Sequence, residues 1–378
     1  MSVSINGTSG LVFNDASTQN TAATGFGFKN RIINGAMMID QRNAGASVTN
    51  TAGNVYTLDR WQANADQASK FTVQQNAGSV TPPVGFTNYL GCTSLSAYSV
   101  PSGENFVIRH KIEGFNTADL AWGTANASTV TLSFWVRSSL TGTFGGAITN
   151  SANSYSYPFS YTISAANTWE QKSVTITGAT SGTWIGATNG IGLQIKFSLG
   201  AGSTFSGTAG AWASADYASA TGATSVVGTN GATFYITGVQ LEKGSTATSF
   251  DYRPYGTELA LCQRYYEKSF NIGTAPANNL NTENKTTFVT YDSNGAGLSY
   301  MAFLVAKRTS PTMTYYSSSQ TGSGADNWQF FNGSVWANGT GTTTAGSTER
   351  GNLVYFDTTL GNSAGQYCFG HWAASAEL

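Results

Sequence analysis

The residues that most enzymes use for catalysis are sparse in this chain. Its 378 residues include two histidines, His110 and His371, so no multi-histidine metal site can form within one chain. His110 shares a face of an alternating segment with Phe106 and Ile108, which favours a buried structural histidine over a catalytic one. Motifs of serine hydrolases, nucleotide-binding loops and Cys-x-x-Cys redox centres are absent from the sequence. We therefore expect no cofactor and no metal.

Carboxylate pairs that could cleave a glycosidic bond can be distant in sequence, so they need separate consideration. Acids are scattered thinly through the first two thirds of the chain: Asp40, Asp59, Glu104, Glu113, Glu170 and Glu242. Asp59 stands beside Arg60, which favours an ion pair with a neighbouring arginine over a nucleophile. We expect a protein that is not an enzyme, with a polysaccharide depolymerase as the less favoured alternative.

Aromatic residues give the first positive signal. Tyr155, Tyr157, Phe159 and Tyr161 occupy alternate positions, so on a strand their rings share one face. Sugar rings stack on such a face through their C–H groups, which makes Tyr155 and Tyr157 candidates for glycan binding. The same spacing also suits half of a buried sandwich core, and that interpretation is the more economical one.

A second aromatic cluster lies in the segment 327–339, where rings alternate with Asn and Gly in a hairpin-like pattern. Exposed rings at a loop tip mark recognition more often than packing. Trp328, Phe331 and Trp336 are therefore the other glycan-binding candidates, and burial in a core is an equally good interpretation.

The composition excludes several functional classes. Only 10% of the residues are charged, against roughly 25% in an average domain, and 18 Lys+Arg against 19 Asp+Glu give a net charge of −1. Nucleic-acid binding needs a basic field that this chain lacks. Aromatics at 13% and the low charge argue against disorder. The remaining surface of hydroxyls, amides and rings suits sugars or other proteins without charge steering.

Cysteines and hydropathy limit the setting of the protein. Cys92, Cys262 and Cys368 are odd in number and far apart, which predicts free, buried thiols. The start has no basic segment followed by an apolar run, so we expect no secretion signal. No stretch approaches the roughly 18 apolar residues that would span a bilayer. Synthesis in a cytoplasm followed by release through lysis fits these features.

The pattern of strands predicts an all-β fold. Short alternating segments separated by Gly, Ser, Asn and Thr turns fill residues 29–255, which predicts a jelly-roll β-sandwich. Residues 1–28 have little apolar mass and are predicted to be an attachment arm. Residues 269–378 return to strands, including 301–306, and predict a smaller C-terminal β-sandwich.

One short linking helix is predicted between the two β domains, over 256–268. Thr257 could cap it, and Leu259, Cys262 and Tyr266 would share one face. Because a helix of about three turns cannot stand alone, we expect this face to pack on a domain or to form the seam of a trimer.

Several ordered segments resemble a family of bacteriophage tail-fibre and virion structural proteins. The matching segments are 30–43, 56–61, 132–138, 167–170, 239–244, 248–254 and 262–266. The segment 13–19 is similar to an element near the start of many fibre modules, with Ala16 where Gly is usual. The resemblance covers about residues 13–268 and, more loosely, the C-terminal domain.

The resemblance implies a jelly roll like those of carbohydrate-binding modules, a homotrimer, and a place on the phage tail as a receptor-binding fibre. Its partners would be other tail or virion proteins, through residues 1–28, and a host-surface polysaccharide, with no nucleic acid. The shared segments look like scaffold, so no ligand-binding residue is carried over. The competing hypothesis is a capsid or tail decoration protein without a ligand.

Overall fold

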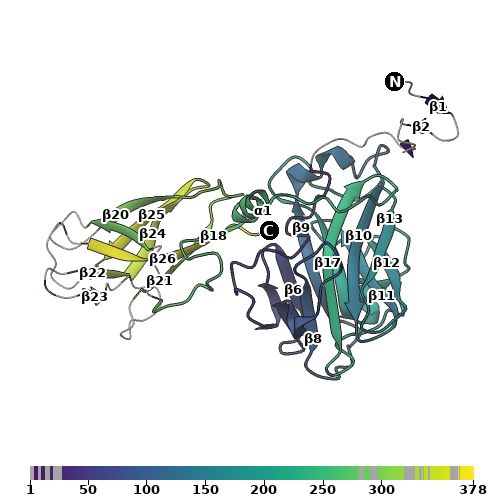
Figure 1. The fold of residues 1–378 in the computed structure, drawn as a ribbon, viewed down its shortest axis with the longest axis horizontal. Helices are drawn as coiled ribbons and strands as arrows, with labels where there is room; N and C mark the ends of the chain where they lie inside the picture. Colours follow the sequence, from purple (N-terminus) through teal and green to yellow (C-terminus); the bar gives the residue numbers. More distant parts are fainter. Residues whose placement is uncertain are drawn as a thin grey trace.

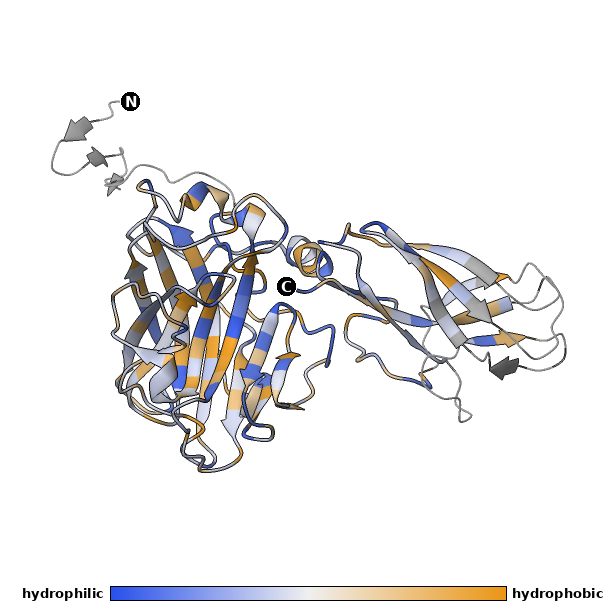
Figure 2. Ribbon diagram, turned by 180° about the vertical axis from the view of Figure 1, so that it is seen from behind, coloured by the Kyte–Doolittle hydropathy of each residue, from blue (hydrophilic) through white to orange (hydrophobic). Residues whose placement is uncertain are grey.

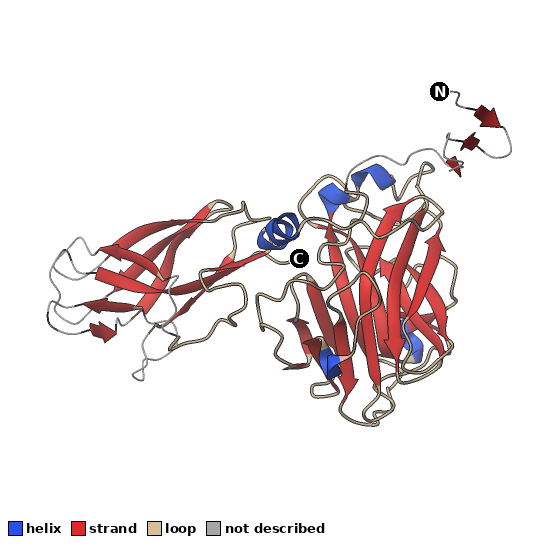
Figure 3. Ribbon diagram, in the orientation of Figure 1, coloured by secondary structure: helices blue, strands red, loops and turns tan. Residues whose placement is uncertain are grey.

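The computed structural model describes residues 28–280, 285–289, 297–318, 328–331, 334, 336–338, 341–357, 365 and 367–378. It also gives the backbone of three short antiparallel strands before residue 28, β1 (Ser4–Asn6), β2 (Gly10–Val12) and β3 (Thr18–Gln19). Two β bodies lie side by side, with the helix α1 (Tyr255–Gln263) between them (Figure 1). Strands dominate both bodies, so the all-β prediction is confirmed (Figure 3).

The larger body is a sandwich of two six-stranded antiparallel sheets. The first, here called the β10 sheet, has the order β13 (Glu170–Ile176), β10 (Val130–Ser138), β17 (Thr233–Lys243), β8 (Leu90–Ser94), β7 (Phe71–Gln75) and β4 (Val48–Thr49). The second, the β9 sheet, has the order β12 (Ser156–Ile163), β11 (Gly142–Thr149), β14 (Ile191–Ala201), β9 (Asn105–Glu113), β6 (Trp61–Ala65) and β5 (Gly53–Tyr56). A short parallel pair, β15 (Ser206–Gly207) and β16 (Ser219–Ala220), lies in the long connection after β14.

The core forms because apolar residues alternate along these strands, so that one face of each sheet can be buried. Leu132 and Phe134 of β10 and Ile108 of β9 are fully buried between the sheets. Hydrophobic and hydrophilic positions alternate along the strands in Figure 2. His110 is buried with them: its ring lies 5.1 Å from that of Trp61, and burial lowers its pKa well below the usual value. The prediction of a structural histidine fits this position.

The smaller body has a larger and a smaller sheet. The larger sheet contains β18 (Tyr266–Lys268), β26 (Tyr367–Ser375), β22 (Gln329–Phe331), β23 (Trp336–Asn338), β19 (Thr286–Val289) and β21 (Thr312–Tyr316). The smaller sheet contains β20 (Gly297–Ala302), β25 (Gly351–Asp357) and β24 (Gly341–Ser347).

The strand predicted over 301–306 is wrong, because β20 ends at Ala302. The carboxylate of Glu267 accepts the backbone N–H of Leu304 at 2.9 Å and that of Val305 at 3.4 Å. These amides are therefore bound to a side chain and not to a neighbouring strand.

The linking helix is shorter than predicted, since α1 ends at Gln263 and Thr257 does not cap it. Tyr266, Glu267 and Lys268 pair with Ser375, Ala374 and Ala373 of β26 instead of continuing the helix. Pairing with a strand more than a hundred residues away is a tertiary effect that the local helix pattern cannot reveal.

The predicted trimer seam is not available in this structure. Cys262 is 0% exposed and Tyr266 6% exposed, both covered by the same chain. Leu259 packs against a small cluster that includes Ile33 and Ile39. The seam prediction is therefore corrected: these three residues join α1 to the two β bodies. Homotrimer formation itself stays a prediction.

Residues 376–378 return to the larger sandwich and form the junction between the two bodies. Glu377 pairs with Arg42 at 2.9 Å and also with Arg60, whose guanidinium lies 3.6 Å from the ring centre of Tyr265. Lys111 of β9 donates to the main-chain oxygen of Leu378 at 2.5 Å. These buried and paired charges hold the two bodies together at the junction.

Candidate functional site

Of the two tyrosines predicted to bind glycan, Tyr157 is buried in the core and Tyr155 is half-buried against it. Tyr157 is 6% exposed and shares the sandwich core with Tyr161. Tyr155 is half-buried, and its ring stacks on that of Trp212 at 5.4 Å between centroids. Gly182 packs so close to the same ring that a Cβ there would approach it to 2.9 Å. Rings covered in this way offer no platform to a sugar, so this prediction is wrong.

Of the second set of predicted glycan-binding residues, Trp328 is also buried. The hairpin itself exists, since β22 pairs with β23. Trp328 is 0% exposed, and its indole donates to the carbonyl of His371 at 3.0 Å, so it is a core residue and not a contact at a tip. Phe331 is half-buried, and the side chain of Trp336 lies outside the described residues.

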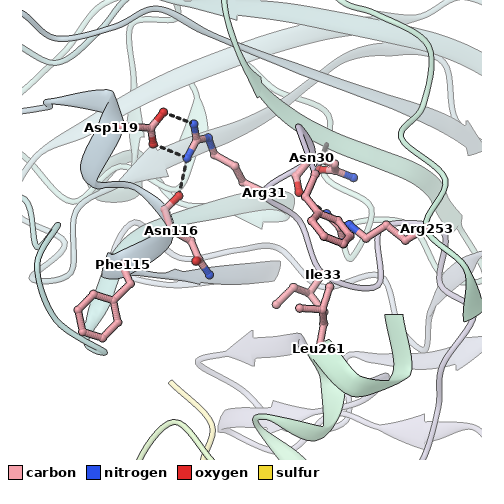
Figure 4. A pocket seen from close by; sticks show the side chains of 9 residues that line it. Asn30, Arg31, Ile33, Phe115, Asn116, Asp119, Arg253 and Leu261 are labelled. Carbon is pink, nitrogen blue, oxygen red and sulfur yellow. Dashed lines mark hydrogen bonds and ion pairs between the residues drawn. The ribbon is translucent and has the colours of Figure 1, made fainter. Parts of the chain in front are cut away.

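A hollow of about 320 Å³ opens at the end of the larger sandwich where β9 stops (Figure 4). The hollow lies between the segment that enters the sandwich, the two short 3-10 turns η2 (Gly114–Asn116) and η3 (Ala118–Leu120), Arg253, and α1. Its lining residues are Phe28, Asn30, Arg31, Ile33, Phe115, Asn116, Asp119, Arg253 and Leu261.

Two exposed aromatic rings flank this hollow. Phe28 is 67% exposed and Phe115 is 58% exposed, which is unusual for such large apolar side chains. Figure 4 places Phe115 and Arg253 on opposite sides, and the ring of Phe28 lies 5.5 Å from the guanidinium carbon of Arg253. The hollow is therefore bounded by rings whose surfaces are open to a ligand. We call it the Phe28–Phe115 hollow.

An exposed ion pair forms the polar wall of the hollow. The two terminal guanidinium nitrogens of Arg31 donate to the carboxylate of Asp119, at 2.8 and 2.7 Å, and one of them also donates to the carbonyl of Asn116 at 2.5 Å. The hydrogen bond from Arg31 and the nearby charge of Lys243 lower the pKa of Asp119 below its usual value. The carboxylate is 54% exposed, so it keeps room to accept further hydrogen bonds from a ligand.

Arg253 fixes the opposite wall. Its guanidinium pairs with Glu258 of α1 at 2.9 Å and donates to the carbonyl oxygens of Asn30 and Ile32. The cation of Arg253 is thus balanced by a carboxylate, as Arg31 is by Asp119. The hollow carries no unpaired charge, which favours an uncharged ligand.

The chemistry of this arrangement suits a sugar. Open ring surfaces can take the C–H face of a pyranose, while the carboxylate of Asp119 and the amide of Asn116 can bind its hydroxyls. Figure 4 shows the Asn116 side chain pointing into the hollow. An apolar pocket with a few convergent polar groups is the usual form of a small-molecule site.

Sequence reasoning missed Phe28 and Phe115 because neither belongs to a periodic pattern. One signal was present: Phe115 stands between Gly114 and Asn116, the same kind of setting that marked the segment 327–339. Exposure, however, depends on how η2 leaves β9, and that is a tertiary property.

Within the part of the chain that the structure describes, no three His, Cys, Asp or Glu side chains gather as a metal site would require. No described helix is long and apolar enough to cross a membrane.

No family model and no curated protein matches this chain. Solved structures that it resembles include the enzymatically active domain of bacteriophage CBA120 tailspike protein 4, at 13% identity and a TM-score of 0.32, over 57% of this chain and 22% of that one. Another is the family 11 carbohydrate-binding module of a Clostridium thermocellum cellulase, at 11% identity and a TM-score of 0.26, over 52% and 99%. The module TmCBM61, solved with β-1,4-galactotriose, gives 10% and 0.29, over 57% and 99%. This chain thus spans about a fifth of the tailspike domain, and scores this low define no family.

Proposed function

We propose that this chain is a receptor-binding fibre of a bacteriophage tail that binds an uncharged polysaccharide on the host surface without cleaving it. The observation that carries the proposal is the Phe28–Phe115 hollow, in which open aromatic rings meet a carboxylate and an amide with no unpaired charge. The charge-poor composition supports the same role, since it leaves hydroxyls, amides and rings to face the ligand.

The virion role rests on the resemblance of the ordered segments described above. Residues 1–28 would attach the chain to other tail or virion proteins, and three copies would assemble into one fibre that is released by lysis. Deletion of residues 1–27, which leaves Phe28 in the hollow, is expected to remove the protein from purified particles while the remaining chain still binds host cells. Loss of cell binding together with particle binding would contradict this division.

The glycan-binding proposal is tested by applying the full chain to an array of purified bacterial surface polysaccharides. Phe115→Ala is expected to lower the affinity for the bound polysaccharide about tenfold or more, because the ring would supply a central stacking contact. Tyr300→Ala is the matched control, since Tyr300 in the smaller body is also 58% exposed. Equal affinity of the two variants would refute the hollow as the site.

Two alternatives give different results in the same assay. A decoration protein without a ligand would bind none of the polysaccharides and no host cells. A depolymerase would release reducing ends from the polysaccharide that it binds, whereas the proposed fibre releases none.

The assembly is tested by light scattering on a sizing column. A trimer has a mass of about three times the chain mass of 39.6 kDa. A monomer would favour a decoration protein or a fibre that needs a partner to assemble.

A further inference from the structure

The indole N–H groups of the tryptophans reveal one unused donor. The chain has nine tryptophans, and all except Trp336 have described side chains. Among these described side chains, only the indole of Trp135 has no hydrogen-bond acceptor in the protein. The others donate to a carbonyl or hydroxyl oxygen: Trp61, Trp122, Trp169, Trp184, Trp212, Trp328 and Trp372.

Trp135 lies on the outer face of the β10 sheet. Its neighbours along β10, Phe134 and Val136, are fully buried in the core, so the alternation of the strand turns Trp135 outward. The side chain is half-buried, and no other described ring packs against it. The indole N–H, which has no acceptor in the protein, is available to a ligand together with the part of the ring that stays exposed.

The residues around Trp135 are polar, and one of them, Arg137 on the same face of β10, is charged; its guanidinium carbon lies 5.4 Å from the ring centre of Tyr235. The strand register places Gln171 of β13 directly opposite on one side and Thr237 of β17 on the other. Ser133 faces Ser173 one step along the same pair of strands. Thr237 and Ser133 are buried, so Gln171 and Ser173 are the neighbours that a ligand could reach. We call Trp135, Ser133, Gln171, Ser173 and Thr237 the Trp135 face.

A β-bulge shapes this face. The register of β10 and β17 shifts between Ser133 and Trp135, next to Gly238, whose φ is 61°. A Cβ at Gly238 would lie 2.5 Å from the ring of Phe86, so only glycine fits there. Bulges of this kind re-aim a side chain, and here the bulge lies opposite Phe134, the residue before Trp135.

We propose that the Trp135 face is a second saccharide-binding surface, one that takes a pyranose with equatorial ring hydroxyls. Such a sugar has a flat C–H face that can lie on the indole ring, while its hydroxyls bond to the indole N–H, the Gln171 amide and the Ser173 hydroxyl. This proposal rests on the proposed function and deepens it, because the hollow and the Trp135 face would hold different parts of one long polysaccharide.

A second copy of the chain is the competing occupant, and the composition of the face argues against it. The centre of a permanent protein interface is apolar, whereas the neighbours of Trp135 on this face are hydroxyls, an amide and the guanidinium of Arg137.

Two sites on one chain would raise the apparent affinity for a long polysaccharide above that of either site alone.

The test uses the full chain on the same array of bacterial surface polysaccharides. Trp135→Ala is expected to lower affinity more than tenfold, through the loss of the stacking surface. Trp135→Phe keeps a ring but loses the N–H, and is expected to lower affinity about threefold to tenfold, the effect of one hydrogen bond. Trp184→Phe is the matched control, because Trp184 is also half-buried but donates to the Ser181 carbonyl.

The outcomes separate the two proposals. If the wild-type chain binds a polysaccharide and Phe115→Ala weakens it while Trp135→Phe and Trp184→Phe behave alike, the Trp135 face is refuted and the hollow stands. If the wild-type chain binds no polysaccharide, both proposals fail. A drop in the solution mass of Trp135→Phe would identify the face as a contact between copies and would also overturn this inference.

Discussion

Among the described residues, arginine–carboxylate pairs lie both at the junction between the two β bodies and at the Phe28–Phe115 hollow. At the junction, the side chains of Arg60 and Glu377 are 1% and 7% exposed. At the hollow, Arg31 and Asp119 are 15% and 54% exposed. The same pair of groups therefore has two uses: where both partners are buried they hold elements together, and where the carboxylate is open they can meet a ligand.

The pKa shifts of two aspartates also differ between the junction and the hollow. Burial raises the pKa of Asp59, near the junction, to about 6. The hydrogen bond from Arg31 and its charge lower the pKa of Asp119 instead. A buried carboxylate is penalised by the loss of water, whereas a half-exposed one keeps its water and gains a cation. The direction of the pKa shift therefore differs between the buried carboxylate of Asp59 and the exposed carboxylate of Asp119.

The largest expected effect is at the junction. Glu377→Ala leaves Arg42 and Arg60 without their carboxylate, and breaking a buried pair in this way costs roughly 3–5 kcal/mol of unfolding free energy. Chemical denaturation would measure the loss, and limited proteolysis would show whether the two bodies separate. A loss below about 1 kcal/mol would mean that the junction behaves like an exposed pair.

The second prediction concerns pH. Because the pKa of Asp59 is about 6 when folded and 3.8 in its ordinary state, the folded chain binds more protons between these values. The stability of the wild-type chain relative to Asp59→Asn should therefore fall as pH rises from about 4 to about 6, by at most about 1.4 kcal/mol per pH unit. Denaturation of both proteins across this range measures the difference.

Asp119, in the hollow, should change stability with pH in the opposite direction to Asp59. The pKa of Asp119 is lowered in the fold, so the stability of the wild-type chain relative to Asp119→Asn should be lost only as pH falls below the usual range of an aspartate. A decline of this difference between pH 4 and 6 with rising pH would contradict the contrast with Asp59.

At neutral pH, Asp119→Asn is expected to change stability by no more than about 1 kcal/mol, since exposed ion pairs contribute little. The affinity for polysaccharide should fall together with the loss of the carboxylate acceptor. Thermal unfolding and the polysaccharide array measure the two effects side by side. Large destabilisation without loss of binding would show that Asp119 supports the fold and does not bind the ligand.

Phe115→Ala should have the smallest effect on stability, within about 0.5 kcal/mol, because the ring is 58% exposed. Its effect on binding should nevertheless be the strongest of the hollow variants. Unfolding of the variant at a much lower denaturant concentration would show that Phe115 supports the fold instead of a ligand.

The sequence determined the strands and their inward faces, because a period of two in apolar residues can bury only one side of a sheet. Leu132 and Phe134 of β10 and the buried His110 were all predictable in this way. The low charge and the sparse acids also follow from the sequence alone, and they direct attention to sugar recognition.

Only the tertiary structure decided which aromatic rings stay open. Trp328 and Phe115 both stand in Asn- and Gly-rich surroundings, yet the first is 0% and the second 58% exposed. The end of α1 was decided in the same way, when Tyr266 paired with Ser375 of β26. Burial depends on which distant strand or loop covers a side chain, and local residue patterns carry no information about that partner.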